Sequence, residues 1–183
     1  MKIFITSLLA IVLLAGCTLL GSNWTIDVDL TEEEQQELEA TVKEYEDKIK
    51  NYEPGPIFNT PEPSIPLWIE LARAQKNLGH LGDALKTYEK AKKIYPRSQA
   101  IENNIGRLYE KAKEYEKAVE QYLYVYEEFQ DPGYLYDITW IYIEIKDRKN
   151  AEKYFNAWQL ATKKTDNQTQ QAIKKLREEE EAE

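Results

Sequence analysis

Hydrophobic residues follow three different patterns along this chain. Residues 3–14 are apolar almost throughout, with only Thr6 and Ser7 interrupting them. Residues 31–52 instead carry apolar side chains at spacings of four, three and four, which is typical of one face of an amphipathic helix. From residue 65 onward, small and aromatic residues recur with a period of about 34 residues, which indicates a repeat of helix pairs. The pattern therefore predicts an all-α protein with a separate apolar segment at its start.

The repeat is clearest around three alanines, Ala84, Ala118 and Ala151, which are 34 and 33 residues apart. A small residue stands twelve positions before each alanine, and an aromatic residue stands four positions after it. Small residues let two helices approach closely, and aromatic rings fill the space beside such a contact. The small residues are Ala72, Gly106 and Thr139, and the aromatic residues are Tyr88, Tyr122 and Phe155.

The first of these units carries a specific residue pattern. Its members are Trp68, Leu71, Ala72, Gly79, Ala84, Tyr88, Ala91 and Pro96. With them the chain resembles the tetratricopeptide-repeat family over residues 65–165, in repeats 65–98, 99–131 and 132–165, and the last two match fewer positions. The resemblance implies a right-handed superhelix of about three helix hairpins. Each hairpin covers the apolar face of the next, so about three are needed for stability.

Two segments precede the repeats. Thr31 and Glu34 form a capping-box pattern at the start of a helix over residues 31–52, whose apolar stripe must dock on another element. Residues 53–66 contain five prolines and one glycine, so residues 53–64 are predicted to be a connector rather than a helix.

A last helix is predicted over residues 166–183, capped by Asp166 or Thr165. Trp158 stands where the first repeat has Ala91, and we expect this large ring to meet the last helix. Glu178–Glu181 follow as an acidic tail, which should be solvated and should fray because acidic side chains are unfavourable at the C-terminal end of a helix.

The start of the chain has the layout of a secretory signal, with Lys2 before an apolar run that is too short for a comfortable membrane span. The stretch Leu14–Ala15–Gly16–Cys17 resembles the lipobox of bacterial lipoproteins. This resemblance implies a signal peptide over residues 1–16 and acyl chains, such as palmitate, attached at Cys17, the only cysteine. A plain secretory signal with a stray cysteine, or an uncleaved anchor, are the alternatives.

Residues 17–30 are predicted to be a lipidated tether. Within it, Trp24 can rest at the lipid interface, where indole rings are favoured, or pack on the folded domain. The sequence alone does not separate these two positions.

The net charge of the chain is −9, and removing residues 1–16 takes away Lys2 and no acid, which leaves −10. Nucleic-acid phosphates would be repelled by this charge, so we expect no nucleic-acid partner. A basic patch is also not available to hold the domain on anionic lipid, so membrane affinity must come from the lipid on Cys17.

The resemblance places a peptide-binding groove on the first helix of each repeat. Arg73 and Arg107 occupy the same repeat position, so we expect them to project side by side and to grip the carboxylates of an extended peptide. Tyr136 and Trp140 are either aromatic anchors for that peptide or contacts with the last helix. The complete set is Arg73, Lys76, Asn77, Asn103, Arg107, Lys111, Tyr136 and Trp140.

The two-carboxylate clamp of chaperone-binding family members is not reproduced. Ile69 and Gly133 stand where that clamp requires lysine, so chaperone tails are not expected ligands.

No arrangement of residues indicates catalysis, a cofactor or a metal site, and the lone His80 is expected to be an exposed turn residue. The first hypothesis is therefore a lipid-anchored adaptor for other envelope proteins, in pilus, outer-membrane or wall machinery. A self-associating subunit of an envelope complex is the alternative, and an enzyme such as a wall hydrolase is the third. Because Thr18 replaces the aspartate that retains lipoproteins at an inner membrane, we expect the outer membrane where the cell has one, and otherwise the outer face of the cell membrane.

Overall fold

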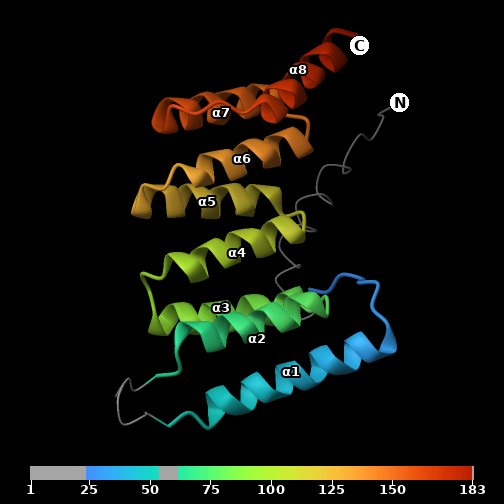
Figure 1. Ribbon diagram of the computed structural model, residues 1–183, viewed down its shortest axis with the longest axis vertical. Coiled ribbons are helices and arrows are strands. Elements are labelled where there is room, and N and C mark those ends of the chain that lie inside the picture. Colours follow the sequence, from blue (N-terminus) through green and yellow to red (C-terminus); the bar gives the residue numbers. More distant parts are fainter. Residues whose placement is uncertain (1–23, 54–61, 183) are drawn as a thin grey trace, which may run out of the picture. The chain divides into compact units, whose positions relative to one another are not determined.

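The computed structural model describes residues 24–53 and 62–182, which form eight α-helices and no strand (Figure 1). Cys17, the predicted signal peptide and most of the predicted connector lie outside these described residues. The chain divides into two compact units, residues 1–90 and 91–183, with the boundary inside α3. The helices are α1 (Glu32–Lys50), α2 (Ile65–Asn77), α3 (Leu81–Ile94), α4 (Gln99–Lys111), α5 (Tyr115–Phe129), α6 (Gly133–Glu144), α7 (Arg148–Thr162) and α8 (Asn167–Ala182).

Helix α1 begins with the capping box that the sequence predicted. The Glu34 backbone N–H donates to Thr31 Oγ1 at 3.2 Å, and the Thr31 N–H donates to Glu34 Oε2 at 2.8 Å. The helix packs on α2 in the first unit (Figure 1). The residues of its apolar stripe are half-buried rather than fully buried, so α1 covers α2 incompletely; they are Leu38, Val42, Tyr45 and Ile49.

The hairpin of α2 and α3 is packed through small residues. Ala72 on α2 and Ala84 on α3 are both fully buried, and Tyr88 is 2% exposed. The turn between the helices needs a left-handed residue, and Gly79 supplies it with φ 81°. Lys113 and Lys146 hold the corresponding places in the next two turns, each with φ 60°. The fold therefore imposes the left-handed conformation even where the sequence offers no glycine.

Residues 24–30 run in an extended conformation along the α2–α3 turn. The Ile26 N–H donates to the Gly79 carbonyl at 3.0 Å, and the Gly82 N–H donates to the Trp24 carbonyl at 2.8 Å. A Cβ atom on Gly79 would lie 2.2 Å from the Ile26 carbonyl oxygen. Alternate side chains of the segment are partly buried, as expected for extended chain on a surface. Of the two positions left open for Trp24, the structure places it on the folded domain.

In the second unit, α4 pairs with α5 and α6 pairs with α7 (Figure 1). Gly106 on α4 lies against the Tyr122 ring of α5, and a Cβ atom there would be 2.4 Å from Tyr122 Cε1. Any larger residue at position 106 would clash with this ring, which explains why the repeat has a glycine there. The core of α5 and α6 is formed by Ala118, Val119, Tyr122, Val125, Tyr134, Ile138 and Ile141.

Helix α8 packs on α6 and α7. Its Ile173 joins Ala151 and Phe155 of α7 in one buried cluster, and Trp158 packs against that cluster, as the sequence predicted. Asp166 caps the helix by accepting from the Thr169 backbone N–H at 2.8 Å.

The prediction of a frayed acidic tail is wrong. Helix α8 continues to Ala182, because two of the glutamates are paired with basic side chains near the start of α7. Lys146 donates to Glu179 at 3.1 Å and Arg148 to Glu180 at 2.6 Å, and these contacts offset the unfavourable helix dipole.

Candidate functional site

All eight predicted groove residues are described, and they lie on α2, α4 and α6, the first helices of the three hairpins. Those on α2 belong to the first unit and those on α4 and α6 to the second, so each group is described by itself. The side-by-side placement of Arg73 and Arg107 stays a prediction.

On α2, Arg73 is exposed and forms an ion pair with Glu70, one turn earlier on the same helix. Asn77 is exposed and Lys76 is half-buried. Burial raises the pKa of the Tyr88 hydroxyl to about 12, while nearby Arg73 lowers it and Glu70 raises it. Arg73 is therefore available at the surface, but a carboxylate of its own helix accompanies it.

On α4, Arg107 and Lys111 are exposed and Asn103 is half-buried. The Tyr122 hydroxyl donates to Glu110 Oε2 at 3.0 Å. Burial raises the pKa of this hydroxyl, Glu110 and Asp137 raise it further, and Arg107 lowers it, so Arg107 lies near both carboxylates. Burial raises the pKa of Asp137 on α6, and the positive charge of Arg107 opposes that increase. Arg107 thus faces acidic groups of both α4 and α6.

On α6, the two aromatic residues differ. The Tyr136 hydroxyl donates to Asp166 Oδ2 at 3.1 Å, and its ring lies 4.9 Å from the Trp158 ring. Tyr136 thereby makes contacts with the capping residue of α8, which is one of the two roles left open for it. Trp140 meets Tyr136 edge-on at 6.3 Å and stays half-buried, so part of its ring remains accessible.

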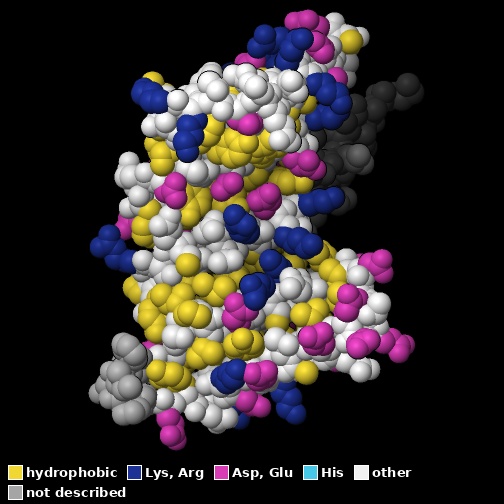
Figure 2. Space-filling model, in the orientation of Figure 1, with side chains coloured by type: hydrophobic (Ala, Val, Ile, Leu, Met, Phe, Trp, Pro, Cys, Tyr) yellow, Lys and Arg dark blue, Asp and Glu magenta, His cyan; other side chains and the backbone are white. Residues whose placement is uncertain are grey.

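Each of the two arginines has an acidic residue three positions away, which the predicted groove did not include. Glu70 precedes Arg73 by three residues and Glu110 follows Arg107 by three, a spacing that places side chains on one face of a helix. That spacing was visible in the sequence. Acidic and basic side chains are also interspersed over the face shown in Figure 2. A ligand carboxylate would therefore compete with Glu70 for Arg73.

Within residues 24–53 and 62–182, no group of three or more histidine, cysteine, aspartate or glutamate side chains is arranged to hold a metal ion. None of the helices in this part of the chain is long and apolar enough to span a bilayer.

Comparison with known proteins agrees with the repeat pattern. Residues 65–98 match the tetratricopeptide-repeat family. A tetratricopeptide-repeat protein from Parabacteroides merdae has a similar structure, with a TM-score of 0.57 at 21% identity, over 80% of this chain and 61% of that protein. The chain thus spans less than two thirds of the length of that relative. No curated protein matches this chain in sequence. The predicted all-α fold of helix hairpins, with an additional helix before them and a capping helix after them, is confirmed.

Proposed function

We propose that this protein is a lipid-anchored scaffold outside the cytoplasm, which binds other polypeptides during assembly of the cell envelope. The observation that carries this proposal is the exposure of Arg73 and Arg107 at equivalent positions of two repeated hairpins. Repeat folds of this kind present extended surfaces to other polypeptides, and a guanidinium group binds a carboxylate in a two-point geometry. The partner is an extended peptide with acidic side chains or a free C-terminal carboxylate.

The lipid anchor is proposed from the sequence around Cys17. A lipid with two or three acyl chains at this residue would hold the protein stably on a membrane. Because Trp24 and Ile26 bind the α2–α3 turn, the first residue held on the domain in the described part of the chain is seven positions from Cys17. Seven residue steps from Cys17 to Trp24 span at most about 25 Å, so the first unit would be held close to the membrane.

The envelope process is pilus, outer-membrane or wall assembly, and the membrane is the outer one where the cell has two. Thr18 carries this expectation, since an aspartate at that position would favour retention at the inner membrane.

The binding role is tested by chemical cross-linking of the full chain in its own cells, followed by identification of the linked polypeptides. We expect the Arg73→Ala/Arg107→Ala variant to lose at least tenfold in yield of the specific adducts. Arg97→Ala/Arg177→Ala is the matched control, because it removes the same charge from two exposed arginines outside the predicted groove. Equal yields from the unchanged chain and the Arg73/Arg107 variant contradict the role assigned to the arginines.

The anchor is tested by mass spectrometry of the N-terminal peptide from membrane-bound protein. The proposal predicts a chain that begins at an acylated Cys17 and that leaves the membrane fraction when Cys17→Ser is introduced. A chain that begins at Met1, or an unmodified Cys17, contradicts it.

A further inference from the structure

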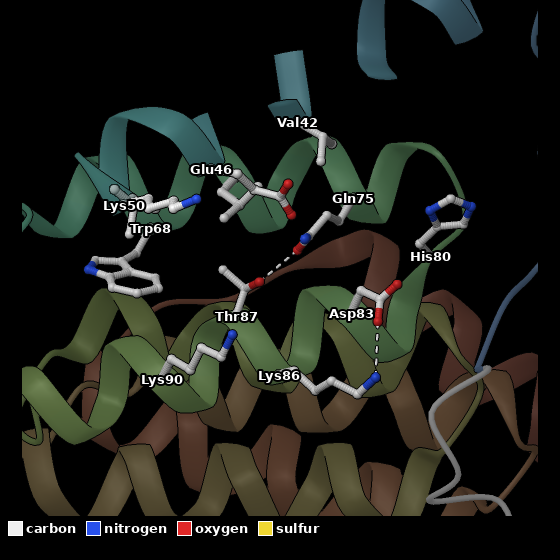
Figure 3. Close-up of a pocket in the computed structure, with 12 residues that line it drawn as sticks. Val42, Glu46, Lys50, Trp68, Gln75, His80, Asp83, Lys86, Thr87 and Lys90 are labelled. Atoms are coloured by element: carbon white, nitrogen blue, oxygen red, sulfur yellow. Dashed lines mark hydrogen bonds and ion pairs between the residues drawn. The ribbon is translucent and has the colours of Figure 1, made fainter. Parts of the chain in front are cut away.

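A cavity of about 600 Å³ lies in the first unit among α1, α2 and α3 (Figure 3). This volume is within the range of pockets that hold ligands. Trp68, Leu71 and Gln75 line it from α2, where their spacing places them on one face of the helix. Arg73 and Asn77 lie on another face of α2, so the cavity is separate from the predicted groove.

One buried donor at the cavity has no acceptor among the described residues. Trp68 is 8% exposed, and its Nε1 is buried with no hydrogen-bond partner among the described residues. Gln75 is 7% exposed, and its Oε1 accepts from the Thr87 hydroxyl at 2.8 Å. The Nε2 amide group of Gln75 is thereby left to donate to a ligand. An unpaired buried N–H group is costly, so an acceptor in this cavity would be stabilised.

Basic side chains outnumber acidic ones in the lining of the cavity, although the chain as a whole is acidic. Lys86 Nζ forms an ion pair with Asp83 Oδ1 at 3.0 Å, so these two charges cancel. The other charged side chains of the lining are the basic Lys50 and Lys90 and the acidic Glu46. Within the described part of the chain, no ion pair of Lys50 or Lys90 is found. Figure 3 shows Lys50 and Trp68 at one end of the cavity and His80 and Asp83 at the other.

The remaining surface of the cavity is apolar, from Val42, Ile49 and Leu71. Trp68 and Gln75 are seven residues apart, which is about 10 Å along α2 and equals about three residues of extended chain. A ligand that fits must therefore combine apolar side chains with a negatively charged acceptor, over the length of a short peptide.

We infer that this cavity is a second recognition site, which binds a short extended peptide by a carboxylate and an adjacent apolar side chain. Lys50 and Lys90 attract the carboxylate, while Trp68 Nε1 and Gln75 Nε2 donate to the oxygen atoms of the peptide. Val42, Ile49 and Leu71 hold the apolar side chain. The site uses none of the residues of the Arg73/Arg107 groove, so it can be occupied independently.

The test is a selection of random hexapeptides with free carboxyl ends on the full chain, purified in detergent micelles. We expect enriched peptides to carry a carboxylate beside an apolar residue. The affinity for the most enriched peptide should fall at least tenfold in Lys50→Met/Lys90→Met. Lys43→Met/Lys93→Met is the matched control, because it removes the same charge from one exposed lysine of α1 and one of α3 and should bind as the unchanged chain does.

A second variant, Trp68→Phe, keeps an aromatic ring but removes the N–H donor together with part of the buried indole, so some loss of stability is expected. Circular dichroism checks that the variant remains folded, and its affinity for the enriched peptide should fall severalfold. If Trp68 only fills space, this variant will bind the peptide with unchanged affinity, and the inference is wrong.

Two other outcomes of the selection also overturn the inference. One is that no peptide is enriched on the unchanged chain. The other is that enriched peptides bind Lys50→Met/Lys90→Met normally but are lost from Arg73→Ala/Arg107→Ala. That last result would support the proposed groove and exclude the cavity, so the two proposals fail separately.

Discussion

The first hairpin, α2–α3, and the third hairpin, α6–α7, differ in what their aromatic side chains contact. In the first, alanines bring the helices together and Trp68 Nε1 is left without an acceptor. In the third, aromatic residues gather around Trp158, and the Tyr136 hydroxyl is used by the cap of α8. The first hairpin therefore keeps a buried donor that is available to the peptide proposed above, whereas the aromatic side chains of the third hairpin contact α8 and its capping residue.

The largest expected effect concerns the packing of α8 on α7, the second helix of the third hairpin. Phe155 is 4% exposed and packs with Ile173 of α8, so Phe155→Ala should lower the free energy of unfolding by about 3–5 kcal/mol. Urea unfolding followed by circular dichroism measures this loss. Leu160→Ala on the same helix is the control, since Leu160 is 71% exposed and should change stability by less than about 0.5 kcal/mol. Equal losses from the two variants would show that α8 does not bury this face of α7.

The next effect concerns the turn of the first hairpin. Gly79→Ala places a Cβ atom 2.2 Å from the Ile26 carbonyl in a residue with φ 81°, so the extended segment must move. We expect a loss of about 2 kcal/mol, because the left-handed backbone alone costs about 1 kcal/mol or more. Hydrogen exchange should accelerate at the Ile26 and Gly82 amides. Unchanged protection of both amides would show that these hydrogen bonds do not depend on glycine at position 79, and would contradict the account of how residues 24–30 bind the turn.

The reverse change is expected to stabilise an equivalent turn. Lys113 has φ 60° at the position of Gly79, so Lys113→Gly relieves an unfavourable backbone conformation. The free energy of unfolding should rise by about 0.5–1 kcal/mol, as measured by the same urea titration. A lower free energy of unfolding would mean that contacts of the Lys113 side chain stabilise the fold by more than the left-handed backbone costs.

The smallest effect is dependent on pH and concerns the cap of α8. Hydrogen bonds from Thr169 hold the pKa of the Asp166 carboxyl below its ordinary value. Ionised Asp166 therefore stabilises the folded chain above the unfolded pKa, about 4, and this contribution is lost as the pH falls through the folded value. Asp166→Asn should lower the melting temperature slightly at pH 7.

The same comparison at lower pH isolates the charge of Asp166. The difference in melting temperature between Asp166→Asn and the unchanged chain should shrink below pH 4. Asp27→Asn, which removes an exposed carboxylate from another part of the chain, controls for net charge. A difference that is the same at pH 7 and pH 3 would show that ionisation of Asp166 does not contribute.

The sequence predicted the helices and their packing well, because both depend on local spacing. The period of Ala84, Ala118 and Ala151 placed the hairpins, and Thr31 with Glu34 placed the start of α1. The pairing of Glu179 and Glu180 with Lys146 and Arg148 was missed, since more than thirty residues separate the partners and only the folded backbone brings them together.

The cavity beside α2 could not be predicted for a similar reason. Trp68 fits the repeat pattern as a space-filling residue, and nothing in the spacing shows that its Nε1 lacks an acceptor. That property depends on how α1 lies on α2, and α1 is outside the residues that match the repeat family. The apolar stripe of α1 predicts that this helix docks, but it does not identify the element on which α1 docks or the polar groups that are left around the contact.

The most direct test of the scaffold function is site-specific photo-cross-linking in living cells. A photoreactive residue is introduced at Asn77 on α2, or at Asn156 on α7, both of which are exposed. We predict discrete adducts with envelope polypeptides from position 77 and none from position 156. Adducts from position 156 alone, or none from either position, would contradict the assignment of binding to the first helices of the hairpins.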